Sequence, residues 1–221
     1  MWFENRERFS VPPHGVDCER FHPHEAPQAL REELGIQPEH RVASIIAALR
    51  PEKRHDLFLQ AARQVVDKLP QARFLIVGDG PSRPDFELLA GELDLEQHVQ
   101  FLGSRHDIPE IQALSDVVCP ASTDVESAPI CMLEALASGR PQVATAIGGI
   151  PKIVADGETG LLAPPGDVPA LAQAITRILS DDELAQSMRA ASRTRALEQF
   201  SVEFMVRAHE RLIEDLYKAA R

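Results

Sequence analysis

Residues 42–49 read VASIIAAL, an apolar run with β-branched residues and the length of a buried strand. A helical pattern follows over residues 54–69, where apolar side chains recur three and four positions apart. Residues 73–77 (RFLIV) form a second apolar run, which Gly78-Asp79-Gly80-Pro81 ends. Strands that are apolar along their whole length and separated by helices indicate a parallel sheet covered on both faces.

The same alternation continues to about residue 180. We therefore expect an α/β fold, a doubly wound, Rossmann-like parallel sheet over residues 41–180. Further strands are predicted at 99–102, 116–120, 142–145 and 160–163, and helices at 84–93, 108–114, 129–138, 150–156 and 168–179.

The two ends of the chain differ from this central unit. Residues 1–40 carry five prolines and one short helical pattern at 26–34, so we interpret them as a lead-in or interdomain linker segment. Ser180-Asp-Asp-Glu183 resembles a capping box that begins a helix, and Ser201 is expected to cap another over residues 202 to about 219. No strand separates these helices, so residues 181–221 are expected to form extra C-terminal helices outside the sheet unit.

The composition is that of an ordinary globular protein, with 221 residues, 44% hydrophobic and a net charge of −11. The negative balance argues against nucleic acid as a partner, because nucleic acids attract clustered Lys and Arg. No stretch is long and apolar enough to span a bilayer, and the first residues lack the apolar core of a signal peptide. Three widely spaced cysteines favour neither disulfides nor zinc, and we expect a cytoplasmic protein.

The loop after the strand at 116–120 offers a site for an anion. We expect Pro129 at the first position of the following helix, where its missing N–H costs nothing. The N–H groups of Ile130 and Cys131 would then point outward, unbonded, at the positive end of the helix dipole. Glu126 before the helix and Glu134 within it would flank a bound ligand such as a phosphate with polar groups on either side. The alternative is that these acids only complement the helix dipole.

Residues 126–151, followed by 156–167, resemble the family-four glycosyltransferases (glycosyl transferases group 1), which are retaining sugar-nucleotide enzymes of GT-B architecture. The signature of that family is two glutamates separated by seven residues, which Glu126 and Glu134 match. The resemblance extends through Phe101-Leu-Gly103 and Gly78-Asp-Gly-Pro81 back to Leu49–Lys53 and Pro13–Asp17, and covers about nine-tenths of the chain. It implies that the chain is the C-terminal, donor-binding domain of such an enzyme.

The resemblance also assigns roles to residues. It implies that Glu134 bonds the ribose hydroxyls of the donor nucleotide and that Glu126, the catalytic glutamate, contacts the donor sugar near its reacting face. The amides of Ile130 and Cys131 would hold the distal phosphate, and Lys53 would neutralise the diphosphate. Amides aimed at a leaving diphosphate would stabilise charge where it develops.

Several positions depart from the family pattern. The arginine usual five residues before the lysine is Ala48, so Arg50 or Arg54 is expected to reach the same phosphates. The glycines usual after the first glutamate are replaced by Ser127 and Pro129. These departures concern donor affinity more than donor class.

Three further residues are donor-binding candidates through the resemblance. Gly78 and Gly80 lie close to the donor in the family, although alone they would indicate a turn. Arg105 follows a predicted strand, where the loop of the family contacts the nucleotide base. The alternative is a solvated turn in which Asp107 caps the next helix.

No metal and no other cofactor is expected, with the nucleotide sugar itself as substrate. His14, His22 and His24 could suggest a metal site, but they lie in a proline-rich loop without the defined ligand geometry that a metal requires.

The resulting prediction is the donor half of a retaining glycosyltransferase that transfers a hexose from an NDP-sugar (UDP-, GDP- or ADP-sugar). The acceptor would be a glycan, lipid or small molecule, bound mainly by an N-terminal domain that this chain lacks. The last helix is expected to pack on that missing domain, through which the enzyme could attach peripherally to a membrane. The chain alone is expected to be weakly active or inactive.

Two alternatives remain open: a nucleotide-sugar epimerase-like enzyme of the same fold, and a non-catalytic nucleotide-sugar-binding or scaffold module. An acceptor-independent change in the sugar would favour the epimerase. If substitution of Glu126 and Glu134 had no measurable effect, the non-catalytic module would be favoured.

Overall fold

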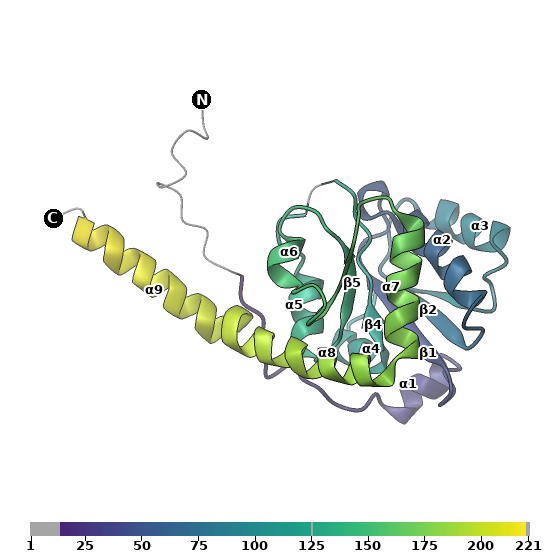
Figure 1. Ribbon diagram of the computed structural model, residues 1–221, viewed down its shortest axis with the longest axis horizontal. Helices are drawn as coiled ribbons and strands as arrows, with labels where there is room; N and C mark the ends of the chain where they lie inside the picture. Colours follow the sequence, from purple (N-terminus) through teal and green to yellow (C-terminus); the bar gives the residue numbers. More distant parts are fainter. Residues whose placement is uncertain (1–13, 125, 220–221) are drawn as a thin grey trace.

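A computed structural model describes residues 14–124 and 126–219 (Figure 1). Its centre is a six-stranded parallel sheet of order β3-β2-β1-β4-β5-β6, which confirms the predicted doubly wound α/β fold. The strands are β1 (Arg41–Ile46), β2 (Ala72–Val77), β3 (Val99–Gly103), β4 (Val117–Val118), β5 (Gln142–Thr145) and β6 (Gly160–Ala163).

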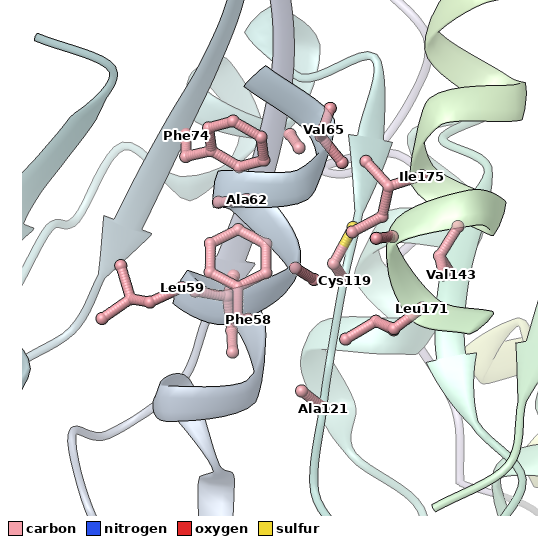
Figure 2. Close-up of a cluster of buried hydrophobic side chains, with 14 of the residues drawn as sticks. Phe58, Leu59, Ala62, Val65, Phe74, Cys119, Ala121, Val143, Leu171 and Ile175 are labelled. Atoms are coloured by element: carbon pink, nitrogen blue, oxygen red, sulfur yellow. The ribbon is translucent and has the colours of Figure 1, made fainter. Parts of the chain in front are cut away.

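Helices cover both faces of the sheet because successive strand residues point to opposite sides. Ala43 and Ile45 of β1 pack in one cluster with α2, α3 and α7, whereas Val42 packs on the other face with α1 and α4. Figure 2 shows the first cluster, where Phe58 of α2 and Leu171 of α7 approach the sheet. The helices are α1 (Gln28–Glu33), η2 (Pro51–Lys53), α2 (His55–Val66), α3 (Arg83–Glu92), α4 (Ile108–Leu114), α5 (Ile130–Ala137), α6 (Ile150–Ile153), α7 (Val168–Ser180), α8 (Asp182–Arg195), η3 (Ala196–Phe200) and α9 (Val202–Ala219).

The strand order reverses between β1 and β4, which pair directly through Ala43 with Val117 and Ser44 with Val118. The chain leaves these two strands at the same edge of the sheet and turns to opposite faces. Ligands of open α/β sheets bind in the crevice that forms at such a point. The loops after β1 and β4 are therefore the ones to inspect for a site.

Two glycines predicted to lie near the donor hold the loop after β1 in place. Gly78 has φ +133°, and a Cβ there would lie 2.1 Å from the Ala47 carbonyl oxygen. A Cβ on Gly80 would lie 2.4 Å from the carbonyl oxygen of Leu49, whose N–H donates to the Asp79 carbonyl at 3.1 Å. These contacts take the chain out of the sheet at Ile46, so β1 ends three residues before the predicted residue 49.

The predicted cap at Ser180 is wrong, whereas the one at Ser201 is confirmed. Ser180 is the last residue of α7, and its hydroxyl donates to the Arg177 carbonyl. The side chain of Asp181, which has extended backbone angles, accepts from the Leu184 N–H at 2.9 Å and caps α8 instead. Ser201 Oγ accepts from the Phe204 N–H at 3.1 Å at the start of α9.

The described part of the lead-in segment, residues 14–40, packs on the domain. Val16 forms a parallel bridge with Ser201, and Arg193 of α8 donates to the carbonyls of Cys18, Phe21 and Ala137. The sequence pattern missed the contacts of Arg193 with Cys18 and Phe21 because they join residues more than 170 positions apart.

The helix α9 extends away from the sheet domain and buries none of its residues (Figure 1). Its apolar face is exposed, with Val206, Ile213 and Leu216 each 44–66% exposed. Within residues 14–124 and 126–219, no helix has the length and apolar character needed to span a membrane.

The imidazole of His55, at the start of α2, is fully buried against the ring of Phe86. Neither ring nitrogen has a hydrogen-bond partner among the described residues. Burial lowers the pKa of His55 from 6.5 to about 4, partly opposed by Asp56. The folded chain therefore holds this ring neutral at pH values where the unfolded chain protonates it.

We predict that the free energy of unfolding falls as the pH decreases from about 6.5 to 4, because protons then bind the unfolded state preferentially. The pKa shift of His55 corresponds to a loss of at most about 3 kcal/mol in the free energy of unfolding. Denaturant titrations at several pH values should show that the free energy of unfolding depends less steeply on pH for His55→Leu than for the wild type. The control His209→Gln, at an exposed position of α9, should keep the wild-type slope. Equal slopes for His55→Leu and the wild type would contradict this assignment.

Candidate functional site

The loop after β4 leads into α5 through Pro129, which is the N-cap and not the first helical residue as predicted. Its ψ of 122° is extended, so the helix begins one residue later. Ile130 and Cys131 therefore occupy the first two helical positions. The Met132 N–H donates to the Pro129 carbonyl at 3.1 Å, whereas within the described ranges the Ile130 and Cys131 amides have no backbone acceptor. Two free amides thus remain at the positive end of the helix, as expected.

The two side chains at this helix start place no negative charge beside the amides. Ile130 is 60% exposed, and Cys131 is half-buried. Burial raises the pKa of the Cys131 thiol to about 12, and the nearby carboxylates of Glu134 and Glu126 raise it further, while Lys53 opposes them. The thiol therefore stays neutral and contributes no negative charge. The same electrostatic effects indicate that Lys53 and both glutamates surround Cys131.

Glu126 is a buried carboxylate held by two donors. Its Oε1 accepts from the Ser122 hydroxyl at 2.7 Å and forms an ion pair with Lys53 Nζ, and only 8% of the residue is exposed. Ser122 itself is fixed because its carbonyl accepts from the Thr145 hydroxyl of β5. Lys53 comes from the loop after β1 and Glu126 from the loop after β4. The fold therefore brings together two of the residues that the sequence singled out.

The backbone of Glu126 lies directly on the turn formed by Gly148 and Gly149. The Gly149 N–H donates to the Glu126 carbonyl at 2.8 Å. A Cβ on Gly148, where φ is +51°, would lie 2.0 Å from the Glu126 carbonyl oxygen, and one on Gly149 would lie 1.7 Å from the carbonyl oxygen of Ser127. Only glycine fits such an approach. Sequence reasoning did not recognise this support, although the Gly-Gly pair after a predicted strand was a visible signal.

Glu134 is the fifth residue of α5 and is half-buried. Burial raises the pKa of its carboxyl, and the positive charge of Arg20 opposes this shift. Arg20 belongs to the lead-in segment, so that segment contributes charge beside the second glutamate. The sequence analysis did not single out Arg20, because only the fold brings it within reach of Glu134.

The two arginines expected to reach the phosphates, Arg50 and Arg54, differ in their contacts. Arg50 is exposed, and within the described residues its guanidinium has no polar partner. Arg54 donates to Asp56 at 2.9 Å and to the Thr123 hydroxyl at 3.1 Å, so it reaches the loop after β4. Of the two candidates to replace the family arginine at Ala48, Arg50 is the one whose guanidinium is not held by another described side chain.

Arg105 is not brought to Glu126 by any described contact. Its guanidinium forms ion pairs of 2.6 Å with Glu33 of α1 and with Asp107. Asp107 occupies the N-cap position of α4 without a side-chain cap bond, because its carboxylate binds Arg105 instead, which lowers the pKa of Asp107. The side chain of Arg105 therefore fastens the loop after β3 to α1.

Among the described residues, no group of three or more His, Cys, Asp or Glu side chains could hold a metal ion. The rings of His22 and His24 lie 5.0 Å apart, and in each the Nδ1 lies 2.9 Å from a backbone carbonyl oxygen. The alternative of a histidine metal site receives no support from this geometry.

Comparisons with known proteins identify the family of this chain. The family model described as "Glycosyl transferases group 1" matches residues 27–195. N-acetyl-alpha-D-glucosaminyl L-malate synthase of Bacillus anthracis is 33% identical over 189 residues, which are 86% of this chain and 49% of the relative. A GDP-mannose-dependent alpha-(1-6)-phosphatidylinositol monomannoside mannosyltransferase of Mycolicibacterium smegmatis is also 33% identical, over 199 residues, 86% of this chain and 52% of that protein.

Solved structures show the same fold. The crystal structure of Anabaena HepE in complex with UDP and glucose matches with a TM-score of 0.84 and 27% identity, over 96% of this chain and 57% of that one. This chain thus spans about half the length of the proteins it matches. Its sheet order, its glutamates before and within α5 and these matches lead to one conclusion: the chain belongs to the glycosyl transferases group 1 family and has the Rossmann-like fold of GT-B glycosyltransferases.

Proposed function

We propose that this chain is the donor-binding half of a retaining glycosyltransferase that transfers a hexose from a nucleotide sugar. The observation that carries the proposal is the contact of Lys53 with Glu126 beside the free amides of α5. A cation and two unbonded amides can bind the diphosphate of a nucleotide sugar, and two carboxylates can accept hydrogen bonds from its hydroxyl groups. All of these protein groups lie at one edge of the sheet. The presence of UDP in the similar HepE structure supports this assignment.

In the proposed complex, the distal phosphate accepts from the amides of Ile130 and Cys131. When the bond to the sugar breaks, negative charge develops on the leaving diphosphate, and the amides and Lys53 stabilise it. The chain itself carries a net charge of −11, so such local donors are needed to hold an anionic donor. We propose that Arg50 adds to them from the loop after β1, and that no metal or other cofactor is required.

The ion pair between Lys53 and Glu126 gives the two residues linked roles. In the structure, each balances the charge of the other. We propose that a bound diphosphate takes over Lys53 and that the carboxylate of Glu126, still held by Ser122, then turns toward the donor sugar. Glu134, further along α5, would accept from the ribose hydroxyls.

We propose a UDP-, GDP- or ADP-sugar as donor. HepE was solved with UDP, and the mannosyltransferase of M. smegmatis is GDP-mannose-dependent, so the family resemblance leaves the base open. The loop after β3, held by Arg105, is proposed to contact the base through its backbone. A calorimetric screen of the three nucleotide classes would identify it.

We further propose that the acceptor, a glycan, lipid or small molecule, binds mainly to an N-terminal domain outside this chain. The exposed apolar face of α9, which includes Val206, Ile213 and Leu216, is proposed to pack on that domain. The three cysteines are free, which supports the proposed cytoplasmic location.

We predict that Glu134→Ala weakens the binding of the bare nucleoside diphosphate by about 1–3 kcal/mol, the usual scale for hydrogen bonds to a charged group. Glu126→Ala should leave this binding unchanged or strengthen it, because Lys53 loses its carboxylate partner. Glu126→Ala should instead remove the difference in binding affinity between the bare nucleotide and the nucleotide sugar. Isothermal titration calorimetry measures both effects. If both variants weakened the bare nucleotide equally, the assigned roles would be wrong.

We predict that Gly149→Ala weakens donor binding by at least about tenfold, since its Cβ would displace the loop that carries Glu126. Gly91→Ala is the matched control, because the added Cβ would lie in ordinary contact with the Glu96 side chain, 3.7 Å away. Titration calorimetry and thermal melts should show a folded Gly149→Ala protein with a weakened site. Wild-type affinity in that variant would contradict the proposed support of the loop.

We also predict that this chain alone binds the nucleotide sugar weakly and transfers the sugar poorly or not at all, because the proposed acceptor site lies outside it. An assay with radiolabelled donor and candidate acceptors measures transfer. Efficient transfer by the isolated chain would contradict this part of the proposal. A change of the sugar without acceptor would favour the epimerase alternative.

A further inference from the structure

A second cavity lies at the opposite edge of the sheet from the glutamate site. It has a volume of about 560 Å³, within the usual range for small-molecule sites. Arg41 begins β1, Asp116 directly precedes β4, and Arg140 lies two residues before β5, so the cavity opens at the amino ends of these strands. The residues that line it are His24, Glu25, Ala26, Gln28, Arg31, Pro38, His40, Arg41, Val42, Ala113, Leu114, Asp116, Arg140 and Arg189.

The lining is unusually basic for a chain with a net charge of −11. Four arginines (Arg31, Arg41, Arg140 and Arg189) line it with two carboxylates, Glu25 and Asp116, and a third carboxylate, Asp182, pairs with Arg41 at 2.9 Å. The guanidinium of Arg31 has no hydrogen-bond or ion-pair partner in the described part of the chain. Positive charge therefore exceeds negative charge in this cavity.

Two of these arginines also keep buried donors without partners. Arg140 is only 8% exposed and donates from its terminal nitrogens to the Ser115 and His24 carbonyls, at 3.2 and 3.3 Å. Arg189 pairs with Asp116 at 2.6 Å. In both arginines the Nε is buried and has no acceptor among the described residues. Buried donors without acceptors are rare in folded proteins and call for an explanation.

The surroundings of Arg140 disfavour its positive charge. Burial is the largest of the effects that lower the pKa of Arg140 to about 10, and the positive charges of Arg189 and Arg31 lower it as well. The negative charge of Asp116 opposes the shift. Asp116 is already shared, because its other oxygen accepts from the Val42 N–H at 2.9 Å. Asp182 and Asp116 thus pair with Arg41 and Arg189, whereas no carboxylate of the described residues pairs with Arg31 or Arg140.

We propose that this cavity is a second binding site, for a small phosphate-bearing anion. Guanidinium groups form paired hydrogen bonds with phosphate oxygens, and their planar forks suit that geometry better than a point charge does. A phosphate group would neutralise the excess charge around Arg31 and Arg189 and bring acceptors to a cluster that lacks them. The site is separate from the donor site, because the two occupy opposite edges of one parallel sheet.

The test uses inorganic phosphate as the probe in isothermal titration calorimetry, at constant ionic strength. Phosphate could also bind at the start of α5, so the titration is made in the Lys53→Gln background as well as in the wild type. We expect one saturable site that persists in Lys53→Gln. Arg31→Gln should weaken it by about tenfold or more, the scale of a lost charge-assisted contact. Arg177→Gln, at an exposed position of α7, is the matched control and should leave it unchanged.

Three outcomes would overturn the proposal: no saturable phosphate binding, loss of all binding in Lys53→Gln, or equal affinities for Arg31→Gln and Arg177→Gln. Citrate, titrated in the same way, distinguishes the ligand class. Binding of citrate more tightly than phosphate would overturn the assignment to phosphate.

A second readout does not depend on how the variants fold. In the wild-type protein, the Nε–H resonances of Arg140 and Arg189 should shift progressively when phosphate is added, because an acceptor then approaches the cluster. If these two resonances stayed fixed while backbone amides at the start of α5 moved, phosphate would be binding at the donor site alone, and the proposal would fail.

Discussion

The adjacency of β1 and β4, where the strand order reverses, is the constraint on which the rest of the structure depends. Lys53 and Glu126 are 73 residues apart in sequence, and they meet because their two strands deliver both loops to the same edge. The same geometry sets the start of α5 near the loop after β1, so a partly buried ion pair and two amides without backbone acceptors among the described residues lie at the same edge of the sheet. Charge and hydrogen-bond donors thus gather where the sheet leaves room for a ligand.

Close backbone contacts then fix the loops that carry these groups. The Gly78 and Gly80 turn presses on residues 47–49, and Gly148 and Gly149 press on the backbone of Glu126. In each case a Cβ would overlap a carbonyl oxygen, so glycine serves the packing of one loop on another rather than the flexibility of either. The site is therefore built by contacts between backbone segments, which position side chains that do not themselves contact the glycines.

The sequence predicted what local patterns determine. Apolar runs and helical periods placed nearly all strands and helices of the sheet domain, and the spacing of the two glutamates identified α5. It misplaced two helix starts by one residue, because the backbone angles there are extended at Asp181, which caps α8, and at Pro129, which precedes α5 as its cap. The pairing of Arg105 with Glu33, and the arginines gathered at the opposite edge, join distant segments and leave no periodic trace in the sequence.

The central claim is that the free amides at the start of α5 bind the diphosphate of the donor. The most direct measurement is a titration of the ¹⁵N-labelled chain with UDP and GDP, followed by amide chemical shifts. The account predicts that, with the nucleotide that binds, the Ile130 and Cys131 amides move most and shift downfield, as expected for N–H groups that gain a phosphate acceptor. Unchanged Ile130 and Cys131 resonances at saturation, with the largest shifts elsewhere on the sheet, would contradict it.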